Sequence, residues 1–465
     1  MSSTSMPQQD AVASTRLYRA VWRWHFYAGL YVIPFMLMLA ITGFFMMLFT
    51  TYLPEYGDRL YVSPKSAMLQ PEALAEAARA SISADATVKQ FNLPYDTETP
   101  AMVKVVSGEV THLVAVDPYS ATVLRSMPED ATWNLFFENI HGKLMLGDWG
   151  DRLIEIAASL GVIMAVTGIY MWWPRNGSFL AALVPSFGSR GRALWKTLHE
   201  TIGAWMFIIL LFFMVSGLAW SGIWGSKMTQ AWSTFPAEKW DNVPLSDKTT
   251  ESLNGSGKKQ VPWGMEQTPL PQSGSAAGVA VLTEGTALNL DTMVGLGRTL
   301  GIEGRFQIAF PGDEKGVWTL SQNTMSYDGS SPTLDRTVHV DQYTGKVLAD
   351  VRYAEYAVAA KAMAVGIALH EGQMGLWNFA LNALFCLSIV FLSVSGVVMW
   401  WKRKPVGQLG SPLYAHDTRI AAPVLGLGAA LAAAFPLGGL AIILFAFVDF
   451  FLPKRFKEAG WQKAS

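Results

Sequence analysis

The chain has 465 residues, of which 51% are hydrophobic and only 15% are charged, and it carries 18 tryptophans. This composition is typical of a membrane protein, and a formal net charge of −1 gives no sign of a nucleic-acid partner, so none is expected. The single cysteine, Cys386, excludes intrachain disulfides and cysteine-based zinc or iron–sulfur centres, which leaves histidine as the main candidate ligand type.

The first predicted element is a membrane span over residues 26–53, which follows a cytoplasmic segment, 1–25. Its apolar run is longer than the core of a cleaved signal peptide, so we expect the span to be retained. Arg16, Arg19 and Arg23 lie just before the run. Because positive charge gathers on the cytoplasmic side of membrane proteins, these arginines place the N-terminus in the cytoplasm.

Strand patterns follow in residues 54–136, where an alternating segment begins at Thr111, turns at Asp117 and resumes as a second strand. Residues 226–365 contain a counterpart, with Asp341 at the turn. We therefore predict two related small α+β domains, both periplasmic, on the far side of the membrane from the N-terminus.

Three further spans are predicted at 141–173, 199–225 and 370–401. Basic residues and tryptophans close the second and fourth of the four spans, which is the usual order of an aromatic belt and cytoplasmic charge. We expect the connecting segments 174–198 and 402–418 to be cytoplasmic.

Residues 419–452 are too long for one span and short for two, and the apolar run is broken near Pro436. Arg419 precedes the run and Lys454 follows it, so both ends carry charge of the cytoplasmic type. A hairpin of two short helices keeps the tail, 453–465, in the cytoplasm, whereas one tilted span would export it. We predict the hairpin, and six spans in total.

The spans repeat. His25 precedes Gly43 by 18 residues, and His199 precedes Gly217 by the same spacing (43 − 25 = 217 − 199 = 18). At ~1.5 Å per residue this is about 27 Å of helix, close to the hydrocarbon thickness of a bilayer. Each of these histidines is therefore expected at one end of a span.

A second pair of histidines repeats as well: His141 runs on to Thr167-Gly168 and a Met-Trp-Trp ending, and His370 runs on to Ser395-Gly396 and the same ending. The halves lie near 15–176 and 190–404, and such an internal duplication decides the architecture. We predict an all-α membrane bundle of four core spans plus the C-terminal hairpin, carrying the two small α+β domains.

The four repeated histidines are the candidate ligands. One histidine at a membrane interface is more often a polar belt residue, but four at equivalent positions, out of seven in the chain, favour a function. Imidazoles that face each other across a bundle suit haem iron. We predict two haem b groups, held by His25 with His199 at the cytoplasmic side and by His141 with His370 at the periplasmic side. Six-coordinate iron suits electron transfer.

Other residues of this predicted site have two interpretations. Gly29 and Gly203, one turn beyond the cytoplasmic histidines, would give a flat porphyrin room, although small residues also serve helix packing. Arg23 and Lys196 could pair with haem propionates, or they could be ordinary cytoplasmic charge. Glu155, unusual at its depth, could pair with nearby Arg152 or serve a proton or ligand path.

The remaining histidines are interpreted without a site: His112 and His339 as surface strand residues, because they do not align when Asp117 is matched to Asp341, and His416 as a loop residue. Methionines in the first span are interpreted as packing rather than as haem ligands. No Gly-rich strand-to-helix fingerprint is present, so a built-in nicotinamide or flavin domain is not expected.

From about Arg16 to Leu452, the sequence resembles the PepSY-associated transmembrane helix family, often called iron-regulated inner-membrane proteins and including ferric-siderophore reductases. The resemblance rests on the Arg-Ala-Val-Trp-Arg-Trp-His25 start, on the three other repeated histidines, on the Met-Trp-Trp endings and on two PepSY-like Val-Asp-x-Tyr hairpins. The first hairpin departs from the second, with Ser120-Ala121 in place of Thr344-Gly345.

The resemblance implies a haem-dependent oxidoreductase of the bacterial inner membrane that releases iron from a ferric siderophore by reducing Fe(III) to Fe(II). The electron donor would be a quinol or a cytoplasmic reductase, and the lipid bilayer would surround the spans. The alternative is a non-redox membrane protein that binds a periplasmic partner or transports haem or siderophore.

Overall fold

The computed structural model describes residues 6–53, 56–175, 177–254, 261–329, 331–404 and 422–451. The chain divides into two compact units, which are described separately. The membrane unit comprises Met1–Phe44, His141–Ser226 and Leu381–Ser465, and the sheet unit comprises Phe45–Ile140 and Lys227–Ala380. The predicted loop around His416 and the predicted tail lie outside the described residues.

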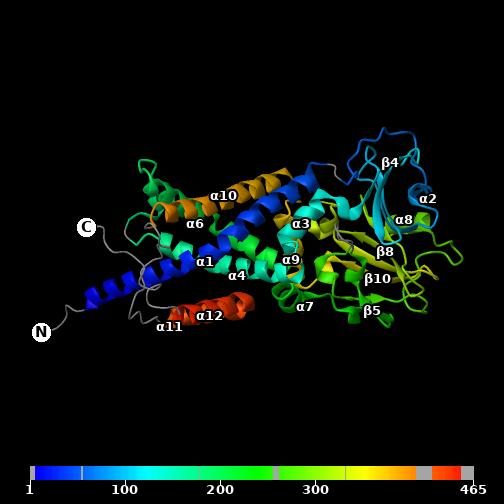
Figure 1. The fold of residues 1–465 in the computed structure, drawn as a ribbon. Coiled ribbons are helices and arrows are strands. Elements are labelled where there is room, and N and C mark those ends of the chain that lie inside the picture. Colours follow the sequence, from blue (N-terminus) through cyan, green and yellow to red (C-terminus); the bar gives the residue numbers. More distant parts are fainter. Residues whose placement is uncertain are drawn as a thin grey trace. The chain divides into compact units, whose positions relative to one another are not determined.

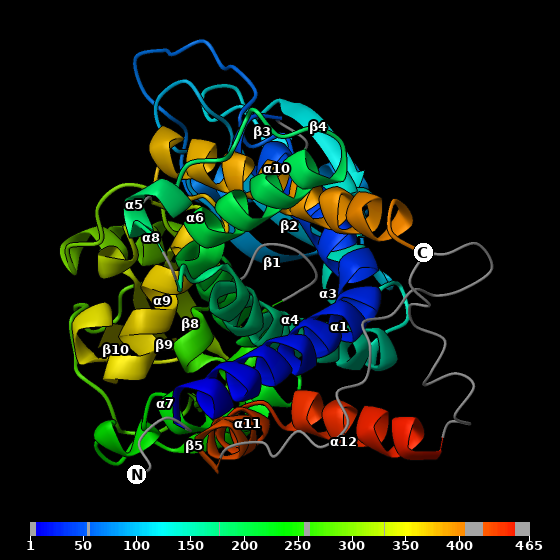
Figure 2. The ribbon, with the colours of Figure 1, turned by 90° about the vertical axis from the view of Figure 1, so that its left-hand side faces the viewer.

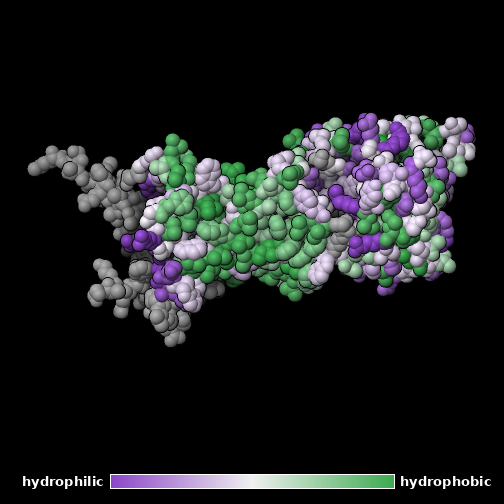
Figure 3. All heavy atoms as spheres, turned by 90° about the horizontal axis from the view of Figure 1, so that it is seen from above, coloured by the Kyte–Doolittle hydropathy of each residue, from purple (hydrophilic) through white to green (hydrophobic). Residues whose placement is uncertain are grey.

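Four helices of the described chain are long and apolar enough to cross a membrane. They are Leu17–Thr51 within α1 (Met6–Thr51), α4 (Asp148–Trp172), α6 (Arg192–Leu218) and α10 (Leu376–Trp401). Figure 2 shows these four helices together, and Figure 3 shows hydrophobic residues gathered on the surface of the membrane unit. Because such a surface is stable only in lipid, the chain is a multi-pass membrane protein.

Close side-chain packing holds the membrane unit together. Its core joins apolar residues of all four helices, and Phe213 of α6 stacks on Phe385 of α10 with ring centroids 4.1 Å apart. At Gly161 of α4 an added Cβ would lie 3.0 Å from the Met214 sulfur, so α4 and α6 pack closely and a larger residue would displace the Met214 side chain. Small residues at helix contacts are typical of membrane bundles.

Two short helices precede the second and fourth spans, contrary to the prediction of continuous spans from His141 and His370. His141 lies on α3 (Trp133–Lys143), and His370 ends α9 (Val358–His370). Leu144, Met145 and Gly147 have positive φ values and break the chain before α4. Gly372 and Gly375, with φ values of 76° and 93°, do the same before α10. These left-handed positions end the first helix in each case.

The C-terminal apolar segment forms two helices, α11 (Ala422–Ala434) and α12 (Pro436–Phe451), with the predicted break at Pro436. A Cβ at Gly439 would lie 2.7 Å from the Ala432 side chain, so the two helices approach closely. Proline ends α11 because it lacks an N–H and its ring clashes with the preceding turn.

The sheet unit contains one antiparallel sheet of eight strands, in the order β10-β9-β8-β7-β1-β2-β3-β4 (Figure 1). The strands are β1 (Thr87–Asn92), β2 (Ala101–Ser107), β3 (Val110–Val116), β4 (Val123–Pro128), β7 (Gln307–Ala309), β8 (Val317–Gln322), β9 (Arg336–Asp341) and β10 (Val347–Arg352). The prediction of two separate domains is therefore wrong, because β1 of the first copy pairs with β7 of the second. The description all-α applies only to the membrane unit.

One face of this sheet carries the apolar core, under α2 (Pro71–Ile82) and α8 (Leu290–Thr299). The two helices cap each other, since Asp291 accepts the Glu72 N–H at 2.9 Å and Glu72 accepts the Leu290 N–H at 3.0 Å. Phe91 of β1 and Phe306 beside β7 are both buried in this core. The apolar contacts therefore cross the seam between the two copies.

On the other face, polar side chains are buried at the seam and in the second copy, and a small apolar cluster around Leu113 lies on the first copy. At the seam, the Gln90 amide donates to Gln307, whose own amide donates to Ser326 at 2.7 Å. His339 of β9 is fully buried, bonded to Thr319 at 2.9 Å, so the prediction of a surface residue is wrong for it. Burial lowers the pKa of His339 to about 3. A second small sheet, β5 (Leu245–Thr249) with β6 (Pro269–Pro271), belongs to the same unit.

Both predicted hairpins are confirmed. The Asp117 carboxylate accepts the Tyr119 N–H at 2.8 Å in the β3–β4 turn, and Asp341 accepts the Tyr343 N–H at 2.9 Å in the β9–β10 turn. Such aspartate turns hold a hairpin by side-chain bonds to the backbone.

The chain also contains the short helices α5 (Phe179–Ala182) and α7 (Ala231–Ser233), and a π-helix at Trp224–Gln230.

Candidate functional site

The membrane unit contains a cavity of about 400 Å³ between α1, α4, α6 and α10. Its wall is largely apolar and aromatic, with rings from Tyr18, Trp22, Phe26, Trp172, Phe207 and Trp400. The volume falls in the range of small-molecule and cofactor sites, which are typically apolar with a few placed polar groups.

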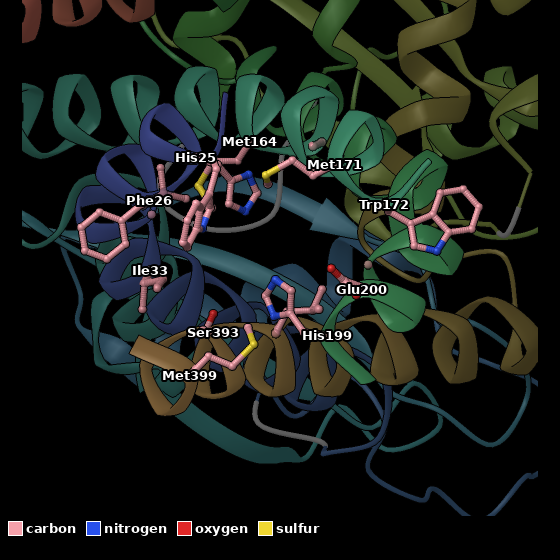
Figure 4. Close-up of a pocket in the computed structure, with 18 of the residues that line it drawn as sticks. His25, Phe26, Ile33, Met164, Met171, Trp172, His199, Glu200, Ser393 and Met399 are labelled. Carbon is pink, nitrogen blue, oxygen red and sulfur yellow. The ribbon is translucent and has the colours of Figure 1, made fainter. Parts of the chain in front are cut away.

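His25 of α1 and His199 of α6 both line this cavity. Figure 4 shows the two imidazoles entering the space from opposite sides. These residues occupy equivalent positions in the two halves of the chain, and the sequence predicted that they face one another. The structure brings them together in one cavity.

One ring nitrogen of each histidine is already engaged. His25 Nδ1 lies 3.0 Å from the Thr167 hydroxyl of α4, and His199 Nδ1 lies 2.8 Å from the Ser395 hydroxyl of α10. In each case Nε2 is the nitrogen that remains for a ligand. A hydrogen bond at one ring nitrogen orients the imidazole so that the other nitrogen can bind a metal.

Glycines leave room around these rings. Gly29 and Gly203, both predicted site residues, line the cavity. Gly168 lies under the His25 ring, since a Cβ there would be 3.4 Å from His25 Cε1, and Gly396 takes the same place under His199 at 4.0 Å. Larger side chains at these glycines would occupy part of the cavity beside the imidazoles.

Cationic side chains lie at the rim, but they are not the predicted pair. Lys196 lines the cavity and is bonded to Glu200 at 3.0 Å, whereas Arg23 is not among the lining residues and stacks on Tyr27. Arg192 and Arg403 line the cavity instead. Burial lowers the pKa of Arg403, and the charge of Arg192 lowers it further, so two guanidinium groups lie close together.

His141 shows the same arrangement as the cavity histidines. Its Nδ1 lies 2.9 Å from the Thr42 hydroxyl, and a Cβ at Gly43 would lie 3.2 Å from His141 Cε1. His141 belongs to the membrane unit and His370 to the sheet unit. Their predicted pairing therefore stays a prediction.

Glu155 is buried and has a structural task. Its carboxylate accepts the backbone N–H groups of Ile223 and Trp224 at 3.2 and 3.1 Å, and it lies 3.6 Å from Arg152. The segment after α6 is thus held against α4. Of the two interpretations of Glu155, the structure supports the pairing with Arg152 and adds the backbone contacts.

Sequence reasoning missed the hydroxyl partners and two of the arginines. A signal for the hydroxyls was present, because a Ser or Thr precedes each glycine at the far end of a repeated span: Thr42, Thr167, Ser216 and Ser395. Arg192 and Arg403 carried no comparable signal, since basic residues are common at the cytoplasmic ends of spans.

No curated protein matches this chain. The family model described as the PepSY-associated TM region matches residues 22–403, a range that contains the four repeated histidines and both hairpins. The match covers most of the chain, so this protein belongs to the PepSY-associated transmembrane family.

Proposed function

We propose that this protein is a di-haem electron-transfer protein of the bacterial inner membrane that reduces ferric siderophores. The observation that carries the proposal is the pair formed by His25 and His199, which reach one cavity from equivalent positions of a duplicated chain. Each imidazole has Nδ1 engaged and Nε2 available. Two such imidazoles that reach one cavity would hold a haem between them.

The wall of the cavity supports a porphyrin as its occupant. Aromatic and aliphatic side chains suit the macrocycle, and Gly29 and Gly203 leave space beside the histidines. Arg192, Lys196 and Arg403 would pair with the two propionates, because carboxylates bind best to cations held by their surroundings. Bound haem would supply a one-electron carrier, and with both axial positions filled by histidine it would favour electron transfer over oxygen chemistry.

The second haem would be held by His141 and His370, at the other end of the same spans. His141 has the hydroxyl and glycine environment found around His25, which supports a second site of the same kind. The basic residues before the first span support an orientation in which the His25–His199 cavity would face the cytoplasm. Electrons would enter there from a quinol or a reductase and leave at the periplasmic side, where Fe(III) in a siderophore is reduced to Fe(II).

The haem content of purified protein tests this proposal. We expect two b-type haems per chain, with low-spin spectra, in a pyridine haemochrome assay. His25→Ala and His199→Ala should each reduce the content to one, while His112→Ala, a partly exposed strand residue of the sheet unit, should leave it at two. A folded wild-type chain without haem would contradict the redox proposal and favour the non-redox alternative.

A second measurement tests the substrate. With dithionite enclosed inside proteoliposomes, wild-type protein should reduce a ferric hydroxamate added outside to Fe(II), trapped by external ferrozine, above the background of protein-free vesicles. A His141→Ala/His370→Ala variant that is normally inserted should lose this activity and keep the His25–His199 haem. Full activity in that variant would contradict the proposed route.

A further inference from the structure

Three histidines of the membrane unit share one hydrogen-bond arrangement. In each case Nδ1 meets a Ser or Thr hydroxyl that is followed directly by glycine: His25 with Thr167, His199 with Ser395 and His141 with Thr42. The partner lies in the other span of the same half of the chain, so the arrangement is reproduced in both halves.

We propose that Thr167, Ser395 and Thr42 are positioning residues that lock these histidines in the Nδ1–H tautomer and so direct the Nε2 lone pair toward a metal. This inference rests on the proposed function, since the metal is the haem iron proposed above. It assigns a specific task to three hydroxyls that themselves make no contact with the iron.

The hydrogen atoms can be assigned at His25. The Thr167 hydroxyl has one hydrogen and is placed to donate it to the Ile163 carbonyl at 2.8 Å, one turn back on α4. The hydroxyl oxygen can then only accept from His25 Nδ1. The same hydroxyl also lies 3.1 Å from the Met164 carbonyl, which can only accept a hydrogen bond. Because the single hydroxyl hydrogen is directed to a carbonyl, His25 Nδ1 is the donor between the imidazole and the hydroxyl.

The second half of the chain repeats these bonds. The Ser395 hydroxyl donates to the Leu392 carbonyl at 3.0 Å. Its single hydrogen is therefore directed away from His199, and Nδ1 is the donor to the hydroxyl oxygen. The position of the carbonyl, three residues before the hydroxyl, is the same as in the first half.

His141 gives a third case. The Thr42 hydroxyl donates to the Met38 carbonyl at 2.8 Å and lies 3.4 Å from the Leu39 carbonyl, so His141 Nδ1 is again the donor to the hydroxyl oxygen. Because the same hydrogen-bond pattern occurs at three histidines, chance packing does not explain it well. Histidine tautomers are set by the bond at the other nitrogen, so the same tautomer follows at all three.

The glycine after each hydroxyl is part of the arrangement. Cβ atoms added at Gly43 and Gly168 would lie 3.2 and 3.4 Å from the Cε1 atoms of the facing histidines. At Gly43 this distance is shorter than an ordinary contact, so a side chain there would crowd the His141 ring. The 3.4 Å at Gly168 and the 4.0 Å at Gly396 are ordinary contacts, so these two glycines lie directly against the rings of His25 and His199.

Two consequences follow for the iron. In the other tautomer Nε2 would carry a hydrogen and bind no metal. Loss of the hydroxyl should therefore weaken haem binding by about 10- to 100-fold, the usual effect of removing a residue that bonds to a metal-binding histidine. Removing an acceptor from Nδ1–H also makes the imidazole a weaker electron donor. The remaining haem should then have a higher midpoint potential, because Fe(II) is disfavoured less.

The full-length chain with ¹⁵N-labelled histidine tests the lock without haem. It has only seven histidines, and His25→Gln and His199→Gln assign the two signals. In haem-free wild-type protein we expect ¹⁵N shifts of the Nδ1–H tautomer at both. Thr167→Val should return His25 to a mixture of tautomers, and Thr167→Ser should restore the wild-type signal. An Nε2–H tautomer in the wild type would overturn the inference.

Haem titration and a spectroelectrochemical potential complete the test, with a matched control on α10. Ser395→Ala should weaken haem binding and raise its potential, whereas Ser388→Ala, which removes a hydroxyl bonded to the Leu384 carbonyl at 2.8 Å, should change neither. If the chain binds no haem but keeps the tautomers, the proposed function fails and the lock stands. If haem binds and Ser395→Ala matches the wild type in affinity and potential, the inference fails alone.

Discussion

The two copies of the duplicated sequence keep equivalent sites in the membrane unit but differ from each other in the sheet unit. In the membrane unit the copies remain interchangeable: His25 and His199 line one cavity, and each is bonded to a hydroxyl at the same place in its own half. In the sheet unit the copies have become unequal parts of one sheet: four of the six residues of β10 are buried, whereas its counterpart β4 has no buried residue.

This difference shows which features depend on symmetry. A ligand held between two equivalent histidines needs both copies of the same residues, so both copies keep them. A sheet is extended by strands that pair at its edges. This pairing uses backbone hydrogen bonds, so the side chains of the two copies can differ. The second hairpin therefore acquired a buried polar face with His339 and Asp335, where the first has Ala115 and Thr111 at the matching positions.

The largest expected effect concerns the seam that joins the copies. Phe306→Ala removes a fully buried ring from the core that spans both copies, and it should destabilise the sheet unit by about 3–5 kcal/mol. Exposed Leu334→Ala serves as the control and should change stability by less than about 0.5 kcal/mol. Thermal unfolding followed by near-UV circular dichroism measures both.

Hydrogen exchange on the Phe306→Ala protein sharpens the comparison. If the sheet is one cooperative unit, protection should fall in β1–β4 as well as in β7–β10. Loss confined to β7–β10 would mean that the two copies still unfold as separate domains.

An intermediate effect should come from Asp335, which has no carboxylate counterpart in the first copy. Burial raises its pKa from 3.8 to about 8, the bond from the Thr324 N–H opposes this rise, and the charge of Asp328 adds to it. Between these values the folded chain holds a proton that the unfolded chain releases. The contribution to stability is therefore complete below pH 4 and is lost as the pH rises toward 8, at no more than about 1.4 kcal/mol per pH unit.

Asp335→Asn tests this dependence, because its side-chain oxygen can still accept the Thr324 N–H while no longer titrating. The fall in melting temperature of the sheet unit between pH 5 and pH 8.5 should be smaller in the variant than in the wild type. An equal fall in both proteins would place the pH dependence elsewhere.

The smallest effect separates the two hairpin turns. Ala121 and Gly345 occupy the same turn position, with φ values of 56° and 66°. Ala121→Gly should stabilise the first turn by less than about 1 kcal/mol, because relief of left-handed strain outweighs the entropy cost of glycine. Gly345→Ala should destabilise the second, since it adds that strain and a contact of 2.8 Å with Leu288. Opposite shifts in melting temperature are expected, and shifts of the same sign would contradict this explanation.

Features that depend only on neighbouring residues could be predicted from the sequence of this protein. Four spans, the break at Pro436, both aspartate hairpins and the duplicated histidines were readable because hydropathy, turn chemistry and spacing act over a few residues or one helix length. The sequence also indicated that His25 and His199 belong to one site, since equivalent positions of a repeat tend to face each other.

Contacts between distant segments could not be predicted from the sequence and became known only from the folded structure. The bond between His25 and Thr167 joins residues 142 apart, and β1 pairs with β7 across more than half of the sheet unit's sequence. His339 is buried because the Trp240 segment, whose ring lies 6.0 Å from the imidazole, packs on a strand that by its pattern alone could face solvent. Such contacts depend on which surfaces meet after folding, and periodicity within one segment carries no information about the partner of a face or an edge.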